Sequence, residues 1–132
     1  MKSKMILYIS IVFIIILGNC NNKENNSNQK NKISQTLHQE IEEYIKQGAI
    51  VIDVRTPEEY QTGHLKNSFN IPYDQIEQHL KELEKYKDKT IILYCRSGRR
   101  SGIAKNILEM NGFRNVVNGI NLSYFPKDLI EK

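Results

Sequence analysis

The stretch 90-TIILYCRSGRRSG-102 decides the fold. It opens with 90-TIILY-94, an apolar and β-branched run typical of a strand buried on both faces. After the glycines, apolar residues recur at helical spacing and stop before Asn111-Gly112: Ile103, Ala104, Ile107 and Leu108. The order predicts a buried strand that leads into Cys95, a short loop and a helix.

Upstream of this stretch, the sequence predicts a helix, a second buried strand and a short capped helix. One helical face carries four apolar residues, and Gly48 follows them where a helix would end: Leu37, Ile41, Tyr44 and Ile45. The run 49-AIVIDV-54 is again apolar and β-branched. Thr56-Pro57-Glu58-Glu59 is a capping box with Pro at the first helical position, so a short helix is expected there.

The remaining segments complete an alternation of strands and helices. A brief strand is expected at 69-FNIP-72 and a third main strand at 115–117. Between them, Asp74 with Glu77 would cap a helix that carries three apolar residues: Ile76, Leu80 and Leu83. This alternation predicts the α/β class, with a parallel sheet flanked by helices on both faces.

The N-terminus has the form of an export signal. Lys2 and Lys4 precede an apolar run from Met5 to Leu17, which is too short to span a bilayer. The end, 17-LGNC-20, resembles a bacterial lipobox, in which the cysteine is acylated after cleavage. We therefore expect a signal peptide over 1–19 and a protein exported and held by lipid on Cys20, facing the periplasm or the cell exterior.

A polar segment follows the signal. The run 21-NNKENNSNQKNK-32 has no apolar residue to bury, so residues 20–32 are expected to form a flexible tether. The folded domain would then cover residues 33–132.

Composition narrows the possible functions. The chain has 132 residues and a formal charge of +4, with lysines that alternate with glutamates over 77–89, which argues against nucleic-acid binding. Two cysteines are too few for a disulfide scaffold. The three histidines form no ligand cluster in the sequence, so neither a metal nor another cofactor is expected.

The loop after Cys95 has the composition of an anion cradle. In parallel sheets, ligands bind at the carboxyl ends of the strands, and a helix N-terminus there favours negative charge. Gly98 and Gly102 let several backbone N–H groups converge, and three side chains add a positive field: Arg96, Arg99 and Arg100. A reactive thiolate is favoured over the alternative of an inert, buried structural thiol.

Two long motifs resemble the single-domain rhodaneses, a sulfurtransferase family: 53-DVRTPEEYQTGHLKNSFNIP-72 and 92-ILYCRSGRRSGIAKNILEMNGFRNVVNGI-120. The resemblance implies a parallel sheet wrapped by helices. It also implies a six-residue active loop, in which Cys95 is catalytic and five residues bind substrate: Arg96, Ser97, Gly98, Arg99 and Arg100.

The resemblance further implies a two-step sulfur transfer. The Cys95 thiolate would take the outer sulfur of a donor such as thiosulfate or a persulfide, and sulfite would leave stabilised by the arginines. An acceptor, either cyanide or a thiol such as that of a thioredoxin-like protein, would then take the sulfur from Cys95.

Three residues of the first motif have a supporting role or a structural one. Asp53 and Arg55 lie at a strand end near the loop, where they would pair with or orient its arginines. A structural salt bridge is favoured over a direct catalytic role. His64 is expected to make a structural hydrogen bond rather than act as a general base.

Two other function classes stay open. Cysteine phosphatases place five residues between Cys and Arg, whereas four separate Cys95 from Arg100, which disfavours a phosphate-binding loop. A non-enzymatic persulfide carrier or rhodanese-like interaction module is the other alternative, and the intact loop favours the enzyme.

The C-terminal part departs from the family pattern of paired glycines and a Trp. The stretch 118-NGINLSYFP-126 has one Gly and no Trp. Tyr124 or Phe125 would take the packing role of the Trp.

Overall fold

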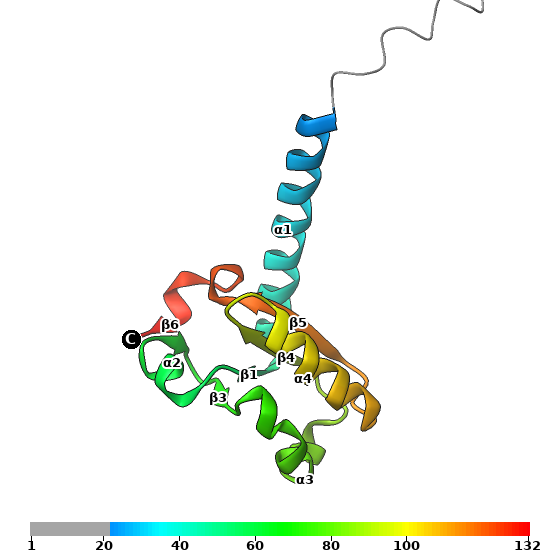
Figure 1. Cartoon of the computed structure of the whole chain (residues 1–132), viewed down its shortest axis with the longest axis vertical. Coiled ribbons are helices and arrows are strands. Elements are labelled where there is room, and N and C mark those ends of the chain that lie inside the picture. The colour runs from blue at the N-terminus through cyan, green and yellow to red at the C-terminus, as the bar shows by residue number, and fades with distance from the viewer. Residues whose placement is uncertain (1–21) are drawn as a thin grey trace, which may run out of the picture. The chain divides into compact units, whose positions relative to one another are not determined.

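A parallel sheet forms the centre of the molecule. The structure, a computed structural model, describes residues 22–132, of which Ser34–Lys132 form one compact unit. Within these residues the main sheet has four parallel strands in the order β3-β1-β4-β5 (Figure 1). Their bounds are Ile50–Asp53 for β1, Phe69–Asn70 for β3, Ile91–Cys95 for β4 and Val116–Asn121 for β5. The predicted α/β class is confirmed.

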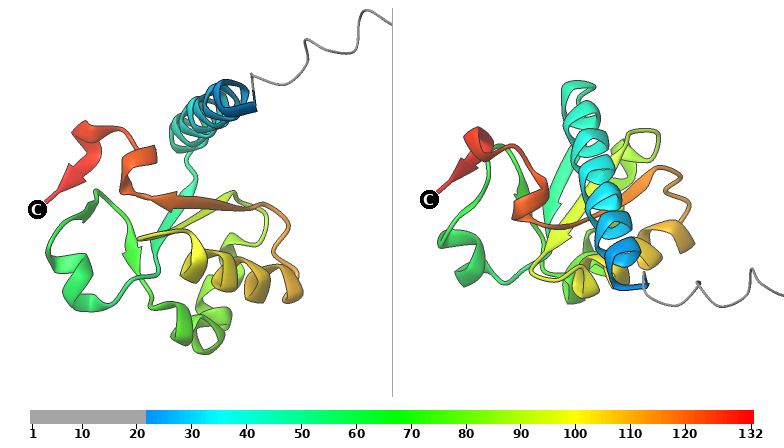
Figure 2. Two further views of the ribbon diagram at one scale, coloured as in Figure 1. Left: turned by 45° about the horizontal axis from the view of Figure 1, so that its top comes forward. Right: turned by 90° about the horizontal axis from the view of Figure 1, so that it is seen from above.

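Strand β4 is buried on both faces because alternate side chains enter two different clusters. Ile91, Leu93 and Cys95 pack against one face, together with residues of helix α4, which spans Arg99–Met110. Ile92 and Tyr94 pack on the opposite face, in a cluster that includes Ile41 of α1. Figure 2 shows the sheet between these two helical layers. The two-residue period of a strand therefore points Cys95 toward α4.

Helix α1 spans Asn22–Lys46, and it begins earlier than expected. Residues 22–32 are helical where a flexible tether was predicted; they contain neither Pro nor Gly, so nothing in them interrupts the helix. The helix ends at Lys46, and Gly48 follows its end as predicted, with φ of 83°. The Gly48 and Ala49 N–H groups donate to carbonyls of the last turn, as in a Schellman motif. Cys20 and the expected signal peptide lie outside the described residues.

The next helix confirms the capping box. Helix α2 spans Pro57–Gln61, the Thr56 hydroxyl accepts the Glu59 N–H, and the Glu59 carboxylate accepts the Thr56 N–H. This reciprocal cap fixes the position of the Glu59 side chain.

The segment after β3 differs from the expected helix. Residues Tyr73–His79 form a 3-10 helix that no side chain caps, so the predicted cap by Asp74 and Glu77 is wrong. Only Leu80–Leu83, α3, is α-helical. In a 3-10 helix residues three apart share a face, which lets Tyr73 and Ile76 pack together on the core.

The structure contains a second pairing of strands that the sequence pattern did not predict. Strands β2 (His64–Leu65) and β6 (Ile130–Glu131) pair antiparallel in a small second sheet. Three more 3-10 helices span Glu84–Tyr86, Leu122–Tyr124 and Lys127–Leu129. Across residues 22–132, none of the helices is both long enough and apolar enough to cross a membrane.

Candidate active site

The loop that carries Cys95 is a tight turn from strand to helix. Cys95 is the last residue of β4 and Arg99 the first of α4, so only residues 96–98 make the turn. Gly98 has φ of 85°, a left-handed conformation that glycine adopts without the steric cost of a side chain. Its N–H donates to the Cys95 Sγ at 3.2 Å, so the turn brings the backbone onto the sulfur.

The Cys95 thiol is buried and surrounded by hydrogen-bond donors. The residue is 2% exposed, and its Sγ lies 3.4 Å from the Ser101 Oγ. Burial raises its pKa, but hydrogen bonds from the Ser101 side chain and from the N–H groups of Ser101, Ser97 and Gly98 outweigh burial. The net effect lowers the pKa of Cys95 from 9.0 to about 7, so a large fraction is the nucleophilic thiolate at neutral pH.

The three loop arginines are placed differently from one another. Arg100 is half-buried, and its guanidinium donates to both oxygens of Glu59 at 2.6 and 2.9 Å. Arg96 is exposed and lines a cavity beside Cys95. Arg99 is exposed in the first turn of α4 and does not line this cavity. Of the three arginines predicted to add positive charge, Arg100 is paired with Glu59, and only Arg96 lines the cavity beside Cys95.

Glu59 is a site residue that the sequence reading missed. Hydrogen bonds from Arg100 lower the pKa of Glu59 to about 2. The same hydrogen bonds raise the pKa of Arg100, and the nearby Cys95 sulfur raises it by a smaller amount. The capping box was the signal that could have located Glu59, since the cap holds this carboxylate at the start of α2. The ion pair joins α2 to α4 across the loop.

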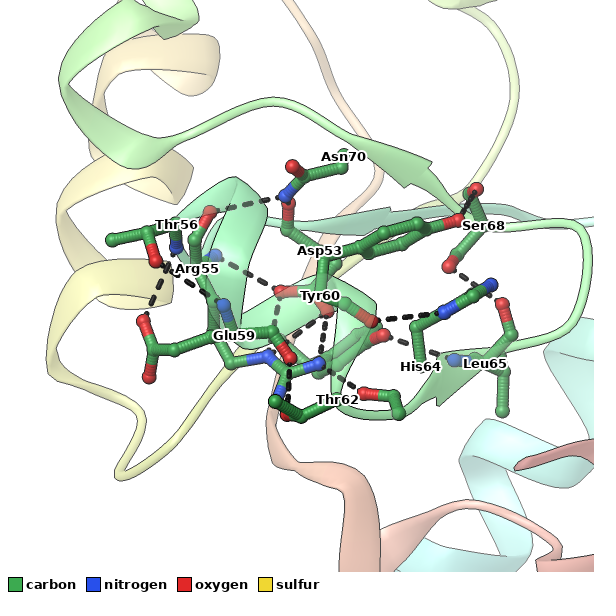
Figure 3. A network of polar contacts seen from close by, with 12 residues as sticks. Asp53, Arg55, Thr56, Glu59, Tyr60, Thr62, His64, Leu65, Ser68 and Asn70 are labelled. Carbon is green, nitrogen blue, oxygen red and sulfur yellow. Dashed lines mark hydrogen bonds and ion pairs between the residues drawn. The ribbon is translucent and has the colours of Figure 1, made fainter. Parts of the chain in front are cut away.

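Asp53 and Arg55 pair with each other and not with the loop arginines (Figure 3). The Arg55 Nε donates to both Asp53 oxygens, at 3.0 and 2.9 Å, and its second terminal nitrogen reaches Asp53 at 2.6 Å and the Gly63 carbonyl at 2.6 Å. Asn70 donates to the carbonyls of Asp53 and Arg55. Asp53 is fully buried, while Arg55 lines the same cavity as Cys95. This is the structural salt bridge considered from the sequence.

Comparison with known families shows to which family this chain belongs. Residues 37–121, more than half of the chain, match the family described as "Rhodanese-like domain". The chain belongs to the rhodanese family. The match includes the whole loop from Cys95 to Arg100.

Relatives of this rhodanese carry more than one described activity. It is 40% identical over 67 residues to the thiosulfate sulfurtransferase PspE of Escherichia coli, a match that covers 51% of this chain and 64% of the relative. It is 38% identical over 72 residues to a tRNA uridine(34) hydroxylase of Cronobacter sakazakii, covering 52% of this chain but 21% of the relative. The chain thus spans less than two thirds of the length of either relative.

A solved structure supports the same fold. The structure described as a rhodanese with anions from E. coli is 34% identical, with a TM-score of 0.58, and the match covers 64% of this chain and 99% of that one.

The C-terminal wall shows how this rhodanese accommodates its departure from the family pattern. The cavity beside Cys95 has a volume of about 390 Å³, and residues 121–123 line it together with Arg55 and Glu59. Of the two aromatic residues considered for packing, Phe125 is the buried one: it is 1% exposed, and the centroid of its ring lies 5.0 Å from that of Tyr94. Tyr124 is half-buried, and its carbonyl accepts a hydrogen bond from the His38 Nδ1.

His64 makes the structural hydrogen bond predicted for it. Its Nδ1 donates to the Tyr60 carbonyl at 3.0 Å, and the two rings stack with centroids 3.7 Å apart. His64 does not line the cavity that contains Cys95.

Proposed function

We propose that this chain is a thiosulfate-type sulfurtransferase that carries sulfur as a persulfide on Cys95. The observation that carries the proposal is the hydrogen-bonded thiol of Cys95 at a strand-to-helix turn, with a pKa lowered to about 7. Membership of the rhodanese family and the similarity to a thiosulfate sulfurtransferase support it.

The first step forms the persulfide. The Cys95 thiolate attacks the outer sulfur of thiosulfate, a new S–S bond forms, and sulfite leaves with the electron pair of the broken S–S bond. Arg96 lines the cavity from the loop, where its charge would stabilise the departing anion. The N–H of Gly98 then remains as a donor to the sulfur.

The second step returns the enzyme to its starting state. A nucleophile attacks the outer sulfur of the persulfide, and the electron pair of that S–S bond returns to the Cys95 Sγ as a thiolate. Cyanide gives thiocyanate, and a thiolate gives a new persulfide. Small thiols and thioredoxin-like proteins are the acceptor classes that fit this step in a cell.

Turnover of thiosulfate and cyanide by the full chain tests the proposal. We expect Cys95→Ala to abolish thiocyanate formation, and we expect mass spectrometry to show one added sulfur on Cys95 after thiosulfate treatment. Cys20→Ala, assayed in detergent, is the matched control and should keep full activity. Absence of both turnover and the added sulfur would overturn the proposal, whereas added sulfur without turnover would identify a carrier and not an enzyme.

We also propose that the protein is exported and anchored by lipid on Cys20, facing the periplasm or the cell exterior. The support is the sequence alone: a basic start, an apolar run and the lipobox-like 17-LGNC-20. Fractionation of cells that express the full chain tests this. Cys20→Ala should move the protein out of the membrane fraction and block palmitate labelling, with Cys95→Ala as the control. Membrane retention of Cys20→Ala without labelled lipid would contradict the proposal.

A further inference from the structure

Cys95 and three other residues form a closed ring of polar contacts that includes the Cys95 sulfur: Gly98, Asn118 and Ser101. The Gly98 N–H donates to the Sγ at 3.2 Å, and the Gly98 carbonyl accepts from the Asn118 Nδ2 at 3.0 Å. The Asn118 Oδ1 accepts from the Ser101 hydroxyl at 2.8 Å, and the Ser101 Oγ lies 3.4 Å from the Sγ. Asn118 belongs to β5, so a neighbouring strand closes the ring from outside the loop.

Backbone groups fix the orientation of the Asn118 amide. Its Oδ1 also accepts the Ile120 N–H at 3.0 Å, and its Nδ2 faces the Gly98 carbonyl, which can only accept. A flipped amide would put two donors together and two acceptors together. The hydroxyl proton of Ser101 therefore points to Asn118 whenever it is not donated to the sulfur.

The strand bends to present this amide. Ile120 has φ of 61°, a left-handed conformation that a β-branched residue rarely adopts. In this conformation its N–H reaches Asn118, and its side chain lies against Gly98, where a Cβ on Gly98 would meet the Ile120 Cγ2 at 3.3 Å. The strained residue thus supports both Asn118 and the loop.

Ser101 has a single proton for two acceptors. When Cys95 is a thiol, its S–H can donate to the Ser101 Oγ while Ser101 donates to Asn118. When Cys95 is a thiolate, the Ser101 hydroxyl can turn to the sulfur, and Asn118 keeps the Ile120 N–H as a donor. The thiolate therefore gains a hydrogen bond without leaving the Asn118 Oδ1 unpaired.

We propose that Asn118 is a positioning residue for Cys95: it holds the Gly98 N–H on the sulfur and competes with the sulfur for the Ser101 hydroxyl. The inference rests on the same thiol as the proposed sulfurtransferase. Its test reads the thiol directly, so it holds or fails independently of any sulfur substrate.

The other charged groups around the thiol stay the same in every variant of the test. They are Arg96 in the loop, Arg99 and Arg100 on α4, Asp53 and Arg55 at the end of β1, and Glu59 on α2. Strand β5, Val116–Asn121, carries no charged residue.

Alkylation of Cys95 by iodoacetamide as a function of pH, followed on the Cys95 peptide by mass spectrometry of the full chain, is the measurement. Asn118→Asp keeps the acceptor, loses the donor to Gly98 and adds a charge that holds the Ser101 proton. The lost donor and the added charge both disfavour the thiolate, so we expect the apparent pKa to rise by about one unit and the rate near pH 6 to fall about tenfold. Asn115→Asp, at an exposed residue just before β5, should leave the profile unchanged.

Combining each Asn118 variant with Ser101→Ala isolates the competition for the hydroxyl. Loss of the hydroxyl should raise the apparent pKa most in the Asn118→Ala background, where the sulfur has no competitor, less in the unsubstituted protein, and least in Asn118→Asp. If Asn118→Asp does not fold, as judged by circular dichroism, the Asn118→Ala and unsubstituted backgrounds still give the order. Equal effects of Ser101→Ala in all folded backgrounds would overturn the proposal, as would a wild-type profile for Asn118→Asp.

Discussion

Glu59 on α2 binds Arg100 on α4 through two hydrogen bonds of 2.6 and 2.9 Å, so one of the loop arginines is neutralised where it stands. The sequence places these residues 41 positions apart. Of the two other loop arginines, Arg96 lines the cavity beside Cys95. The charge around the Cys95 loop is therefore set in part by a residue outside the loop.

Glu59→Gln should release Arg100 and strengthen the binding of a doubly charged donor. We expect the KM for thiosulfate to fall several-fold at low salt, and the effect to shrink at high salt because dissolved ions screen the attraction between Arg100 and the anion. Glu58→Gln, an exposed neighbour that makes no bond to Arg100, is the control. A higher KM in Glu59→Gln would show that Arg100 acts only when Glu59 holds it in place.

The ion pair of Glu59 and Arg100 should make the free energy of unfolding depend on pH in the acidic range. The pKa of Glu59 is lowered from 4.5 to about 2, so its contribution is complete above about pH 4.5 and is lost as the pH falls toward 2. The side chain is 33% exposed, so we expect no more than about 1 kcal/mol. Urea unfolding of Glu59→Gln should show a correspondingly flatter loss of stability over this range, and an unchanged slope would count against the pair.

Modification of Cys95 should follow a titration near neutral pH. Because the pKa of Cys95 is lowered to about 7, the alkylation rate should rise through that pH and level off above it. Ser101→Ala removes a donor to the sulfur and should move the midpoint upward. Urea-unfolded protein is the reference, and a folded midpoint as high as the unfolded one would refute the activated thiol.

The buried pair of Asp53 and Arg55 should be costly to break. Asp53→Ala leaves the Arg55 guanidinium without its carboxylate beside a buried site, and we expect a loss of about 3–5 kcal/mol in the free energy of unfolding. Glu84→Ala, which removes an exposed partner of Lys87, should cost less than about 1 kcal/mol. Urea denaturation measures both, and similar losses in the two variants would contradict the burial argument.

Two glycines should respond to alanine in opposite directions. A Cβ on Gly119 would lie 2.9 Å from the Phe125 Cζ and 3.0 Å from the Ile92 Cγ2, so Gly119→Ala should cost about 1–3 kcal/mol. A Cβ on Gly102, within α4, meets only the Asn118 Nδ2 at 3.5 Å, so Gly102→Ala should stabilise by about 0.5–1 kcal/mol. In the Phe125→Leu background, Gly119→Ala should lower the free energy of unfolding by less than it does in the unsubstituted protein. An equal loss in both backgrounds would show that the Phe125 ring is not what the added Cβ meets.

The sequence determined most of the fold and located the cysteine loop between β4 and α4. Short apolar runs identified β1 and β4, because a strand buried on both faces must be continuously apolar. Local chemistry located the Thr56 cap, the turn at Gly48 and the loop at Cys95. The weakest predictions concerned segments without a clear period, as at Tyr73–His79, where a 3-10 helix replaced the capped helix, and at residues 22–32.

The tertiary structure decided which distant side chains contact the residues of the Cys95 loop and the first turn of α4. Glu59 and Asn118 lie 36 and 23 positions from Cys95 in the sequence, and only the parallel sheet and its crossovers bring α2 and β5 to the same edge. A reactive cysteine can be identified from its loop because the strand, glycine and helix are local. The hydrogen bonds that lower its pKa also come from the loop and the first turn of α4. The ion pair of Arg100 and the second acceptor for the Ser101 proton depend on contacts between distant segments, which no local pattern of residues encodes.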